Sequence, residues 1–158
     1  MRIGFGYDSH RLVPGRPLML GGVLLEHDKG LAGHSDADAV LHAEADAILG
    51  ALAVGDIGDL FPDRDPRWDG ADSTTFVWHA MGLLRARKLR VENCDVTVVA
   101  EQPRLGDQKC RMRRSIAKLL EVEEDAVSVK AKTNEGLDAI GRGEAIAAMA
   151  IVLLTEES

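Results

Sequence analysis

This chain has few cysteines and no apolar segment of signal-peptide length at its start. Two cysteines in 158 residues cannot form a disulfide framework, and Cys94 and Cys110 are too far apart for a C-x-x-C motif. A reducing compartment, the cytoplasm, is therefore the expected location. The first residues reach Asp8 without an apolar core, so we expect no export signal and a mature chain that begins at Met1.

Long hydrophobic runs are also lacking. The longest uninterrupted apolar stretch spans residues 145–154, whereas a membrane-spanning helix needs about 20 such residues. A membrane is therefore not an expected partner. The stretch instead predicts a strand that is buried on both faces, or buried in a subunit contact.

Positive charge is in the minority. The chain has 19 Lys and Arg against 26 Asp and Glu, a formal net charge of −7. Because nucleic-acid binding depends on Lys and Arg neutralising phosphates, a general nucleic-acid binder is not expected. The same balance should repel small phosphorylated ligands unless metal ions stand between the carboxylates and the phosphates.

The hydrophobic pattern predicts one domain over residues 1–158. At about this length folding buries roughly 70% of the surface of the unfolded chain, so a second domain is not needed to provide a core. Ser35 with Asp38 is expected to cap the first helix, and residues 55–66, dense in Gly, Asp and Pro, to form a loop. The expected class is α+β, a two-layer domain with a mixed β-sheet, helices on one face and a small β-hairpin. The expected elements are strands at about 2–8, 96–100, 127–131 and 145–154, a hairpin of 18–20 and 23–25, helices at about 36–53, 73–88 and 112–120, and a loop over 133–143.

Two segments carry side chains that could bind a metal ion. Asp8 and His10 end the first predicted strand, and the period of two directs both to the same side. His42 shares a predicted helical face with Asp38 and Asp46. Two imidazoles and one carboxylate leave a fourth tetrahedral position open, as in catalytic zinc sites. The alternative is an exposed helical histidine and a simple Asp8–His10 hydrogen bond, and spacing alone does not decide between them.

Three further segments could bind ions or polar ligands. His34-Ser35 precedes the first helix, whose N-terminal amides suit a phosphate oxygen, although Ser35 could be a plain N-cap. The acids of 55–66 could bind hard cations or hydroxyl groups, or be solvated turn residues. The segments 130–135 and 141–143 combine positive groups with a carboxylate, as a phosphate site with its own divalent cation requires.

An ordered series of short motifs runs along essentially the whole chain, and together they resemble the family of 2-C-methyl-D-erythritol 2,4-cyclodiphosphate synthases, enzymes of non-mevalonate isoprenoid biosynthesis. One departure is Ala139, where many members have an aromatic residue, which puts in doubt any contact of that ring near the subunit interface. The motifs are Arg2-Ile3-Gly4 with Asp8 and His10, Gly21-Gly22-Val23, His34-Ser35-Asp36 with Asp38 and His42, Gly55-Asp56-Ile57-Gly58, Leu60-Phe61-Pro62-Asp63, Gly70-Ala71-Asp72-Ser73, Asp95-Val96-Thr97, Met112-Arg113, Lys130-Ala131-Lys132-Thr133 with Glu135, and Gly141-Arg142-Gly143-Glu144.

The resemblance implies one zinc ion per subunit, held by Asp8, His10 and His42, and a magnesium or manganese ion held by Glu135 at the diphosphate. It implies catalytic roles for His34 and Thr133. It further implies substrate contacts from Ser9, Ser35, Asp56, Ile57, Gly58, Phe61, Pro62, Asp63, Arg64 and Asp65 to the phosphate and methylerythritol, from Ala100, Pro103, Arg104, Leu105 and Gly106 to the cytidine, and from Lys132, Asn134 and Arg142 to the diphosphate.

The implied assembly is a homotrimer with active sites between subunits, acting on a small cytidine diphosphate substrate. In the implied reaction, the 2-phosphate of 4-diphosphocytidyl-2-C-methyl-D-erythritol 2-phosphate attacks the β-phosphorus and expels CMP. Two other functions stay open from the residues alone. One is a metal-dependent phosphohydrolase that uses metal-activated water, and the other is a non-catalytic, metal-stabilised oligomeric binding protein.

Overall fold

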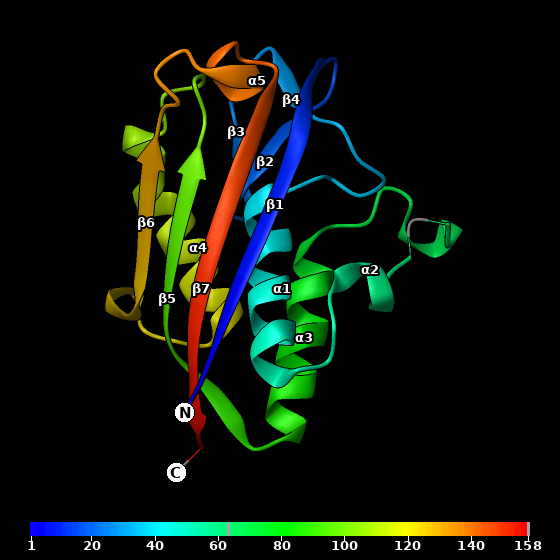
Figure 1. The fold of residues 1–158 in the computed structure, drawn as a ribbon, viewed down its shortest axis with the longest axis vertical. Helices are drawn as coiled ribbons and strands as arrows, with labels where there is room; N and C mark the ends of the chain where they lie inside the picture. The colour runs from blue at the N-terminus through cyan, green and yellow to red at the C-terminus, as the bar shows by residue number, and fades with distance from the viewer. Residues whose placement is uncertain (63, 158) are drawn as a thin grey trace.

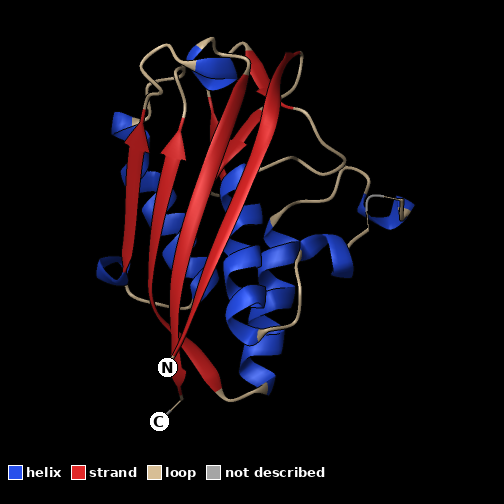
Figure 2. Cartoon of the chain, in the orientation of Figure 1, coloured by secondary structure: helices blue, strands red, loops and turns tan. Residues whose placement is uncertain are grey.

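The computed structural model describes residues 1–62 and 64–157, and it confirms an α+β fold with a mixed sheet. Helices α1, α3 and α4 lie on one side of the main sheet (Figures 1 and 2). The elements are β1 (Arg2–Pro14), β2 (Leu18–Leu20), β3 (Val23–Leu25), β4 (Lys29–Leu31), α1 (Ala39–Leu52), α2 (Ile57–Leu60), η1 (Pro66–Trp68), α3 (Thr74–Ala86), β5 (Leu89–Val99), η2 (Gly106–Gln108), α4 (Lys109–Leu120), η3 (Glu124–Ala126), β6 (Val127–Lys132), α5 (Asp138–Gly141) and β7 (Ala145–Glu156).

The main sheet has the strand order β4-β1-β7-β5-β6, with β5 and β6 parallel and the other neighbours antiparallel. Its long central pair is β1 and β7, with Arg2 opposite Leu154 and His10 opposite Ile146. The two ends of the chain therefore lie together at one end of the sheet (Figure 1). Strands β5 and β6 lie on the opposite side of β7 from β1 and β4. The loops that follow β5 and β6 are therefore separate from those that follow β1 and β4.

Helix α1 lies directly on the backbone of β1. Gly4 and Gly6 face the helix, and a Cβ atom built on either would stand 1.8 Å from a carbonyl oxygen of α1, that of Ala47 or Ala43. Only glycine permits this approach, which strand glycines often mark. The helix is buried along nearly its whole length, and its fully buried residues include Leu41 and Ile48.

The N-terminus of α1 is bound to the β2–β3 hairpin through Asp38. Gly21 and Gly22 have φ values of 60° and 71°, as a two-residue type I′ turn requires, and the predicted hairpin is confirmed. The Asp38 carboxylate accepts from both of these backbone amides, at 2.8 and 2.7 Å, and from the amides of Val40 and Leu41 at 3.1 Å. The prediction that Ser35 caps this helix is therefore wrong. Asp38 also does not share a ligand face with His42, because four backbone donors hold its buried carboxylate.

Three further expectations about elements are corrected. Strand β1 continues to Pro14 and pairs there with β4, which the periodicity did not predict. The segments expected to be loops contain the four-residue helices α2 and α5, each too short to give a helical period. In the single chain, strand β7 is not fully buried on both faces, because Ile151 on the outer face is 42% exposed, and the alternative of burial in a subunit contact stays a prediction.

Two simpler findings concern the expected absences. None of the helices in 1–62 and 64–157 has both the length and the hydrophobicity that a membrane span requires. Both cysteines are free, Cys94 within the core and Cys110 at the surface.

Candidate active site and metal centre

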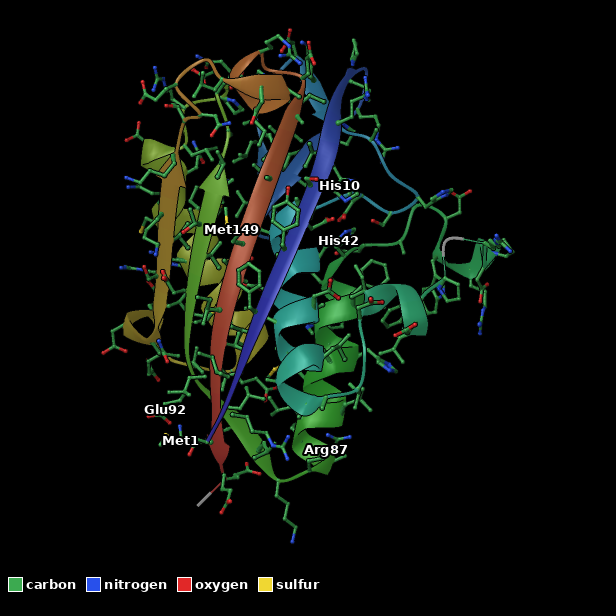
Figure 3. The ribbon with its side chains drawn as sticks, viewed as in Figure 1. Met1, His10, His42, Arg87, Glu92 and Met149 are labelled. Atoms are coloured by element: carbon green, nitrogen blue, oxygen red, sulfur yellow. The ribbon has the colours of Figure 1, made fainter. Side chains whose placement is uncertain are left out.

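Three side chains converge where β1 passes over the first turn of α1. Asp8 and His10 extend from the helix-facing side of β1, and His42 extends from α1 toward them, as the labelled histidines in Figure 3 show. The Asp8 Oδ2 atom lies 2.8 Å from His10 Nε2 and 3.0 Å from His42 Nδ1, and the two imidazole nitrogens are 3.2 Å apart. Within the described residues these three form the cluster of His and acidic side chains that could hold a metal ion.

The triangle of ligand atoms fits a zinc ion. Tetrahedral ligands at about 2.0–2.2 Å from zinc are about 3.3–3.6 Å apart, so the triangle needs to widen by only about half an ångström. Two imidazoles and one carboxylate form a donor set that zinc accepts, with a fourth position left open. The geometry decides against the alternative in which His42 is merely an exposed helical residue, since it is only 7% exposed.

The electrostatics of the cluster also suit a cation. Burial alone would raise the pKa of the Asp8 carboxyl, but the hydrogen bonds and charges of His10 and His42 outweigh burial and hold that pKa well below its usual range. Burial likewise opposes the charged form of His10, but Asp8 raises the pKa of that imidazole above its ordinary value. The Asp8 carboxylate is therefore ionised, and it can pair with either a protonated histidine or a metal ion.

The nitrogens that face away from the cluster are also bonded. His10 Nδ1 lies 2.8 Å from the carbonyl oxygen of Ala32, which can only accept, so this nitrogen carries the hydrogen and Nε2 keeps its lone pair. His42 Nε2 lies 3.1 Å from the Ser35 hydroxyl and 2.9 Å from the Ser73 hydroxyl. The Phe76 ring packs edge-on against His42, with ring centroids 5.4 Å apart. Both imidazoles are therefore fixed in orientation before any ion binds.

A cavity of about 290 Å³ opens over these ligands. One wall is apolar and comes from aromatic side chains, among them Phe61, which contacts both Trp68 and Phe76. This metal cavity is lined by Asp8, His10, Gly33, His34, Ser35, His42, Ile57, Gly58, Phe61, Trp68 and Phe76. Its polar floor and apolar wall are typical of a small-ligand site.

A second cavity of about 270 Å³ lies where β5 and β6 end, on the other side of β7. Positive side chains give it a different character from the first. This basic cavity is lined by Ala100, Pro103, Arg104, Leu105, Gly106, Lys109, Ala131, Lys132 and Thr133. No residue lines both cavities.

Comparison with known proteins identifies the relatives of this chain. The sequence model of the YgbB family matches residues 1–155. The chain belongs to the YgbB family. Among its relatives, 2-C-methyl-D-erythritol 2,4-cyclodiphosphate synthase of Xanthomonas oryzae pv. oryzae (strain PXO99A) is 57% identical over 97% of this chain and 94% of its own. The enzyme of the same name from Symbiobacterium thermophilum is 54% identical over 98% of both.

Solved structures of the family agree with the fold. A structure of 2C-methyl-D-erythritol-2,4-cyclodiphosphate synthase in a CDP-bound form superposes with a TM-score of 0.90 at 42% identity, covering 98% of this chain and 100% of its own. The resemblance to this family inferred from the sequence motifs is confirmed.

The predicted site residues divide between the two cavities. The metal cavity contains the three predicted zinc ligands with His34, Ser35, Ile57, Gly58 and Phe61, and the basic cavity contains Lys132 and Thr133 together with the segment predicted to bind cytidine. Asp63 lies outside the described residues. Others line neither cavity: Ser9, Asp56, Pro62, Arg64, Asp65, Asn134, Glu135 and Arg142.

Several of these outlying residues have local partners. Asp56 caps α2, Asp65 pairs with Arg67 at 2.5 Å, and Arg142 pairs with Glu144 at 3.0 Å. Ser9 is exposed, because alternation along β1 puts its side chain on the face opposite Asp8 and His10. Glu135 is exposed and lies 3.4 Å from the Thr133 hydroxyl, at a positive φ of 52°.

Some residues of the metal cavity were not predicted to belong to the site. Phe76, buried on α3, and Trp68, which follows a turn, carry no functional signal in the sequence. Ser73 does not line the cavity but lies behind His42; it makes no side-chain cap bond at the start of α3 and binds His42 instead. Its position beside His42 depends on how two loops meet, which the spacing of residues does not show.

Proposed function

We propose that this protein is a 2-C-methyl-D-erythritol 2,4-cyclodiphosphate synthase. It converts 4-diphosphocytidyl-2-C-methyl-D-erythritol 2-phosphate to the cyclic diphosphate and CMP. The observation that carries this proposal is the convergence of Asp8, His10 and His42 at the floor of a cavity that also presents His34 and Ser35. The names of its relatives, at more than half identity over nearly the whole chain, support the same reaction.

The reaction needs positioning and charge neutralisation more than proton transfer. An oxygen of the 2-phosphate forms a new bond to the β-phosphorus, and the bond from that phosphorus to the oxygen of CMP breaks. The phosphate nucleophile is already ionised near neutral pH, so no general base is required. Holding two tethered anions in line can contribute several kcal/mol.

The metal cavity suits the phosphate and methylerythritol end of this substrate. Asp8, His10 and His42 would hold the zinc ion, one per subunit, which when bound supplies Lewis-acid charge neutralisation and an anchor for phosphate oxygens. His34 would face the attacking phosphate, and Ser35 would bind it. Ile57, Gly58 and Phe61 would enclose the methylerythritol carbon skeleton and exclude water.

The basic cavity suits the cytidine and the diphosphate. Residues 100–106 would hold the cytidine, while Lys132 and Thr133 would contact the diphosphate. Glu135, exposed beside Thr133, would hold the magnesium or manganese ion there. Arg142 would exchange its solvent-exposed partner Glu144 for a phosphate oxygen, at little cost because surface ion pairs are weak.

A homotrimer would cover the apolar outer face of the central strands. On this face Ile3 lies opposite Leu153, Phe5 opposite Ile151 and Tyr7 opposite Met149. Ile3, Phe5 and Tyr7 are 71%, 60% and 54% exposed. A continuous apolar stripe of this kind marks an interaction surface, and copies of the same chain related by rotation would bury it.

The separation of the two cavities supports active sites between subunits. The substrate must contact zinc ligands and cytidine-binding residues at once, yet these line different cavities on opposite sides of β7. In a cyclic trimer the metal cavity of one subunit would face the basic cavity of the next. Residues outside both cavities, such as Glu135 and Arg142, would then complete a shared site.

The decisive experiment follows the phosphorus products of the purified protein with its cytidyl substrate and magnesium. A cyclic diphosphate and one equivalent of CMP, with no water consumed, are expected in the phosphorus NMR spectrum. Open phosphates would indicate a phosphohydrolase instead. Binding without turnover under any divalent metal ion would indicate a non-catalytic binding protein.

The shared site is tested by mixing two variants of low activity. His42→Ala removes the metal half and Lys132→Ala weakens the diphosphate half. If each site combines halves from two subunits, randomly mixed trimers regain about a quarter of the wild-type activity, since one site in four has both intact halves. No recovery on mixing would contradict a site between subunits.

A further inference from the structure

The side of His42 that faces away from the metal cluster contacts a chain of polar groups with no role so far. Its Nε2 atom lies 2.9 Å from the hydroxyl of Ser73, a residue with no exposed surface. The Ser73 hydroxyl is also hydrogen-bonded to the Asp36 carboxylate, and the Ser73 amide donates to the other oxygen of Asp36 at 3.2 Å. A carboxylate, a hydroxyl and an imidazole are thus connected in that order.

The direction of these hydrogen bonds follows from what each group can do. An ionised carboxylate only accepts, and a serine hydroxyl has a single hydrogen to donate. The other hydroxyl near Ser73, that of Ser35, lies at 3.5 Å and already accepts from the amide of Ala37. The Ser73 hydrogen therefore goes to Asp36, where the bond is charge-assisted.

This direction fixes which nitrogen of His42 carries the hydrogen. With the Ser73 hydrogen directed to Asp36, the Ser73 oxygen presents only lone pairs to Nε2, so Nε2 donates in this 2.9 Å contact, and the Ser35 hydroxyl, 3.1 Å from Nε2, turns its own hydrogen toward the Ser73 oxygen. In a neutral imidazole the other nitrogen, Nδ1, then has the free lone pair. Nδ1 is the atom that points at Asp8 and His10.

We propose that Asp36 and Ser73 are positioning residues of the metal centre, which hold the His42 hydrogen on Nε2 and leave Nδ1 free to bind zinc. The inference rests on the zinc site of the proposed function. His10 achieves the same result with the opposite nitrogens, because the Ala32 carbonyl holds its hydrogen on Nδ1. Such partners behind a metal ligand fix its tautomer and orientation and raise its basicity.

The backbone holds this chain of groups in place. The segment before α1 and the loop before α3 pair through two hydrogen bonds, from the Asp36 amide to the Ala71 carbonyl at 3.0 Å and from the Gly70 amide to the His34 carbonyl at 2.6 Å. The pairing brings Asp36 to Ser73 although 37 residues separate them. The Phe76 ring then limits rotation of His42 from the side.

The first test needs no variant. In zinc-loaded wild-type protein with nitrogen-15-labelled histidine, two-bond proton–nitrogen NMR spectra should show His42 with hydrogen on Nε2 and the metal on Nδ1. Zinc bound through Nε2 of His42 would overturn the proposal. Because this readout is independent of turnover, CMP release could remain intact in that case, which separates failure of this inference from failure of the proposed function.

The second test measures zinc affinity by competition with a chromophoric chelator. Ser73→Ala should weaken zinc binding about 10–100-fold, as removal of such outer partners typically does. The matched control is Asp72→Ala, which removes the neighbouring hydrogen bond to the Thr74 amide without touching His42, and it should leave affinity unchanged. Unchanged affinity in Ser73→Ala, or an equal loss in Asp72→Ala, would overturn the proposal. If Ser73→Ala does not fold, the wild-type spectrum alone decides.

Discussion

The metal cavity and the basic cavity differ in how far the single chain completes them. In the metal cavity the ligand atoms already lie within 3.2 Å of one another, and each imidazole has a partner behind it. In the basic cavity Lys132 is exposed, and Glu135 and Arg142 line no wall at all. The comparison indicates that the single chain already orders the metal cavity, whereas the basic cavity, under the proposed function, would be completed by the substrate and a neighbouring subunit.

Removal of a proposed zinc ligand should have the largest effect. His42→Ala should abolish stoichiometric zinc binding and lower turnover at least about a thousandfold, because Lewis-acid stabilisation is worth several kcal/mol. Metal analysis and CMP release measure the two effects. The control is His27→Ala, whose imidazole contacts only Asp28 at 3.4 Å among the ion pairs of the described residues. Full activity of His42→Ala would contradict the proposal that the metal cavity is part of the active site.

The Lys132→Ala substitution should impair the basic cavity without affecting the metal cavity. The loss of one charged hydrogen bond to the diphosphate, about 1.5–3 kcal/mol, should lower kcat/KM roughly 10–100-fold. Zinc content should stay at the wild-type level, since Lys132 lies in the other cavity. Lys130→Ala is the matched control, because Lys130 lies on the same strand but pairs with Asp95 at 2.5 Å. A loss of zinc in Lys132→Ala would show that the two cavities are not independent.

The pH dependence of zinc binding should report the metal cavity specifically. Asp8 raises the pKa of His10 above 6.5, so protons compete with zinc there and apparent affinity should rise about tenfold per pH unit below that raised pKa. The stability of the metal-free protein should change in the opposite direction. Protonated His10 stabilises the fold below 6.5, and this contribution is lost as the pH rises through the raised pKa. Chelator competition and urea unfolding from about pH 6 to 8 measure the two trends. An affinity that does not change over this range would contradict the expected proton competition.

The smallest effect on either cavity is expected from Glu44→Leu. Glu44 is fully buried on α1, its Oε1 atom lies 3.8 Å from the Cys94 sulfur, and its Oε2 atom has no hydrogen-bond partner among the described residues. Burial, reinforced by the charge of Asp38, raises the pKa of Glu44 well above its ordinary value. Replacing the buried carboxyl group, with its unpaired oxygen, by an apolar side chain should raise the free energy of unfolding in urea by about 1–3 kcal/mol. Zinc content and turnover should not change.

Glu44→Gln serves as the control for the Glu44→Leu variant. It keeps a polar side chain of the same shape in the core, so it should not give the same gain in stability. Equal stabilisation by both variants would mean that charge rather than polarity limits stability at this position. A change in zinc content in either variant would couple this part of α1 to the metal cavity.

Much of the fold and the centre of the site could be predicted from residue spacing. The period of two along β1 correctly put Asp8 and His10 on one side, and the helical period correctly predicted the helix that is α1. The Gly21-Gly22 dipeptide correctly predicted a hairpin. These signals are local, because each depends on residues within one strand, one helix or one turn.

The features that could not be predicted depend on contacts between distant segments. Asp38 has the spacing of a ligand beside His42, but the hairpin amides that bind it come from residues 21 and 22. Ser73 has the sequence context of a helix cap, but it bonds to Asp36 and His42 across 37 and 31 residues. Short elements such as α2 and β4 have too few residues to show a period.

Gly4 and Gly6 affect the geometry of the metal-binding side chains, although they lie further along β1 from that cluster. They set the spacing between β1 and α1, and two of the proposed zinc ligands come from the strand while the third comes from the helix. A side chain at either glycine would lift the helix from the strand and separate His42 from Asp8 and His10. Gly4 and Gly6 therefore determine the size of the ion that fits between the three side chains, although neither glycine contacts that ion.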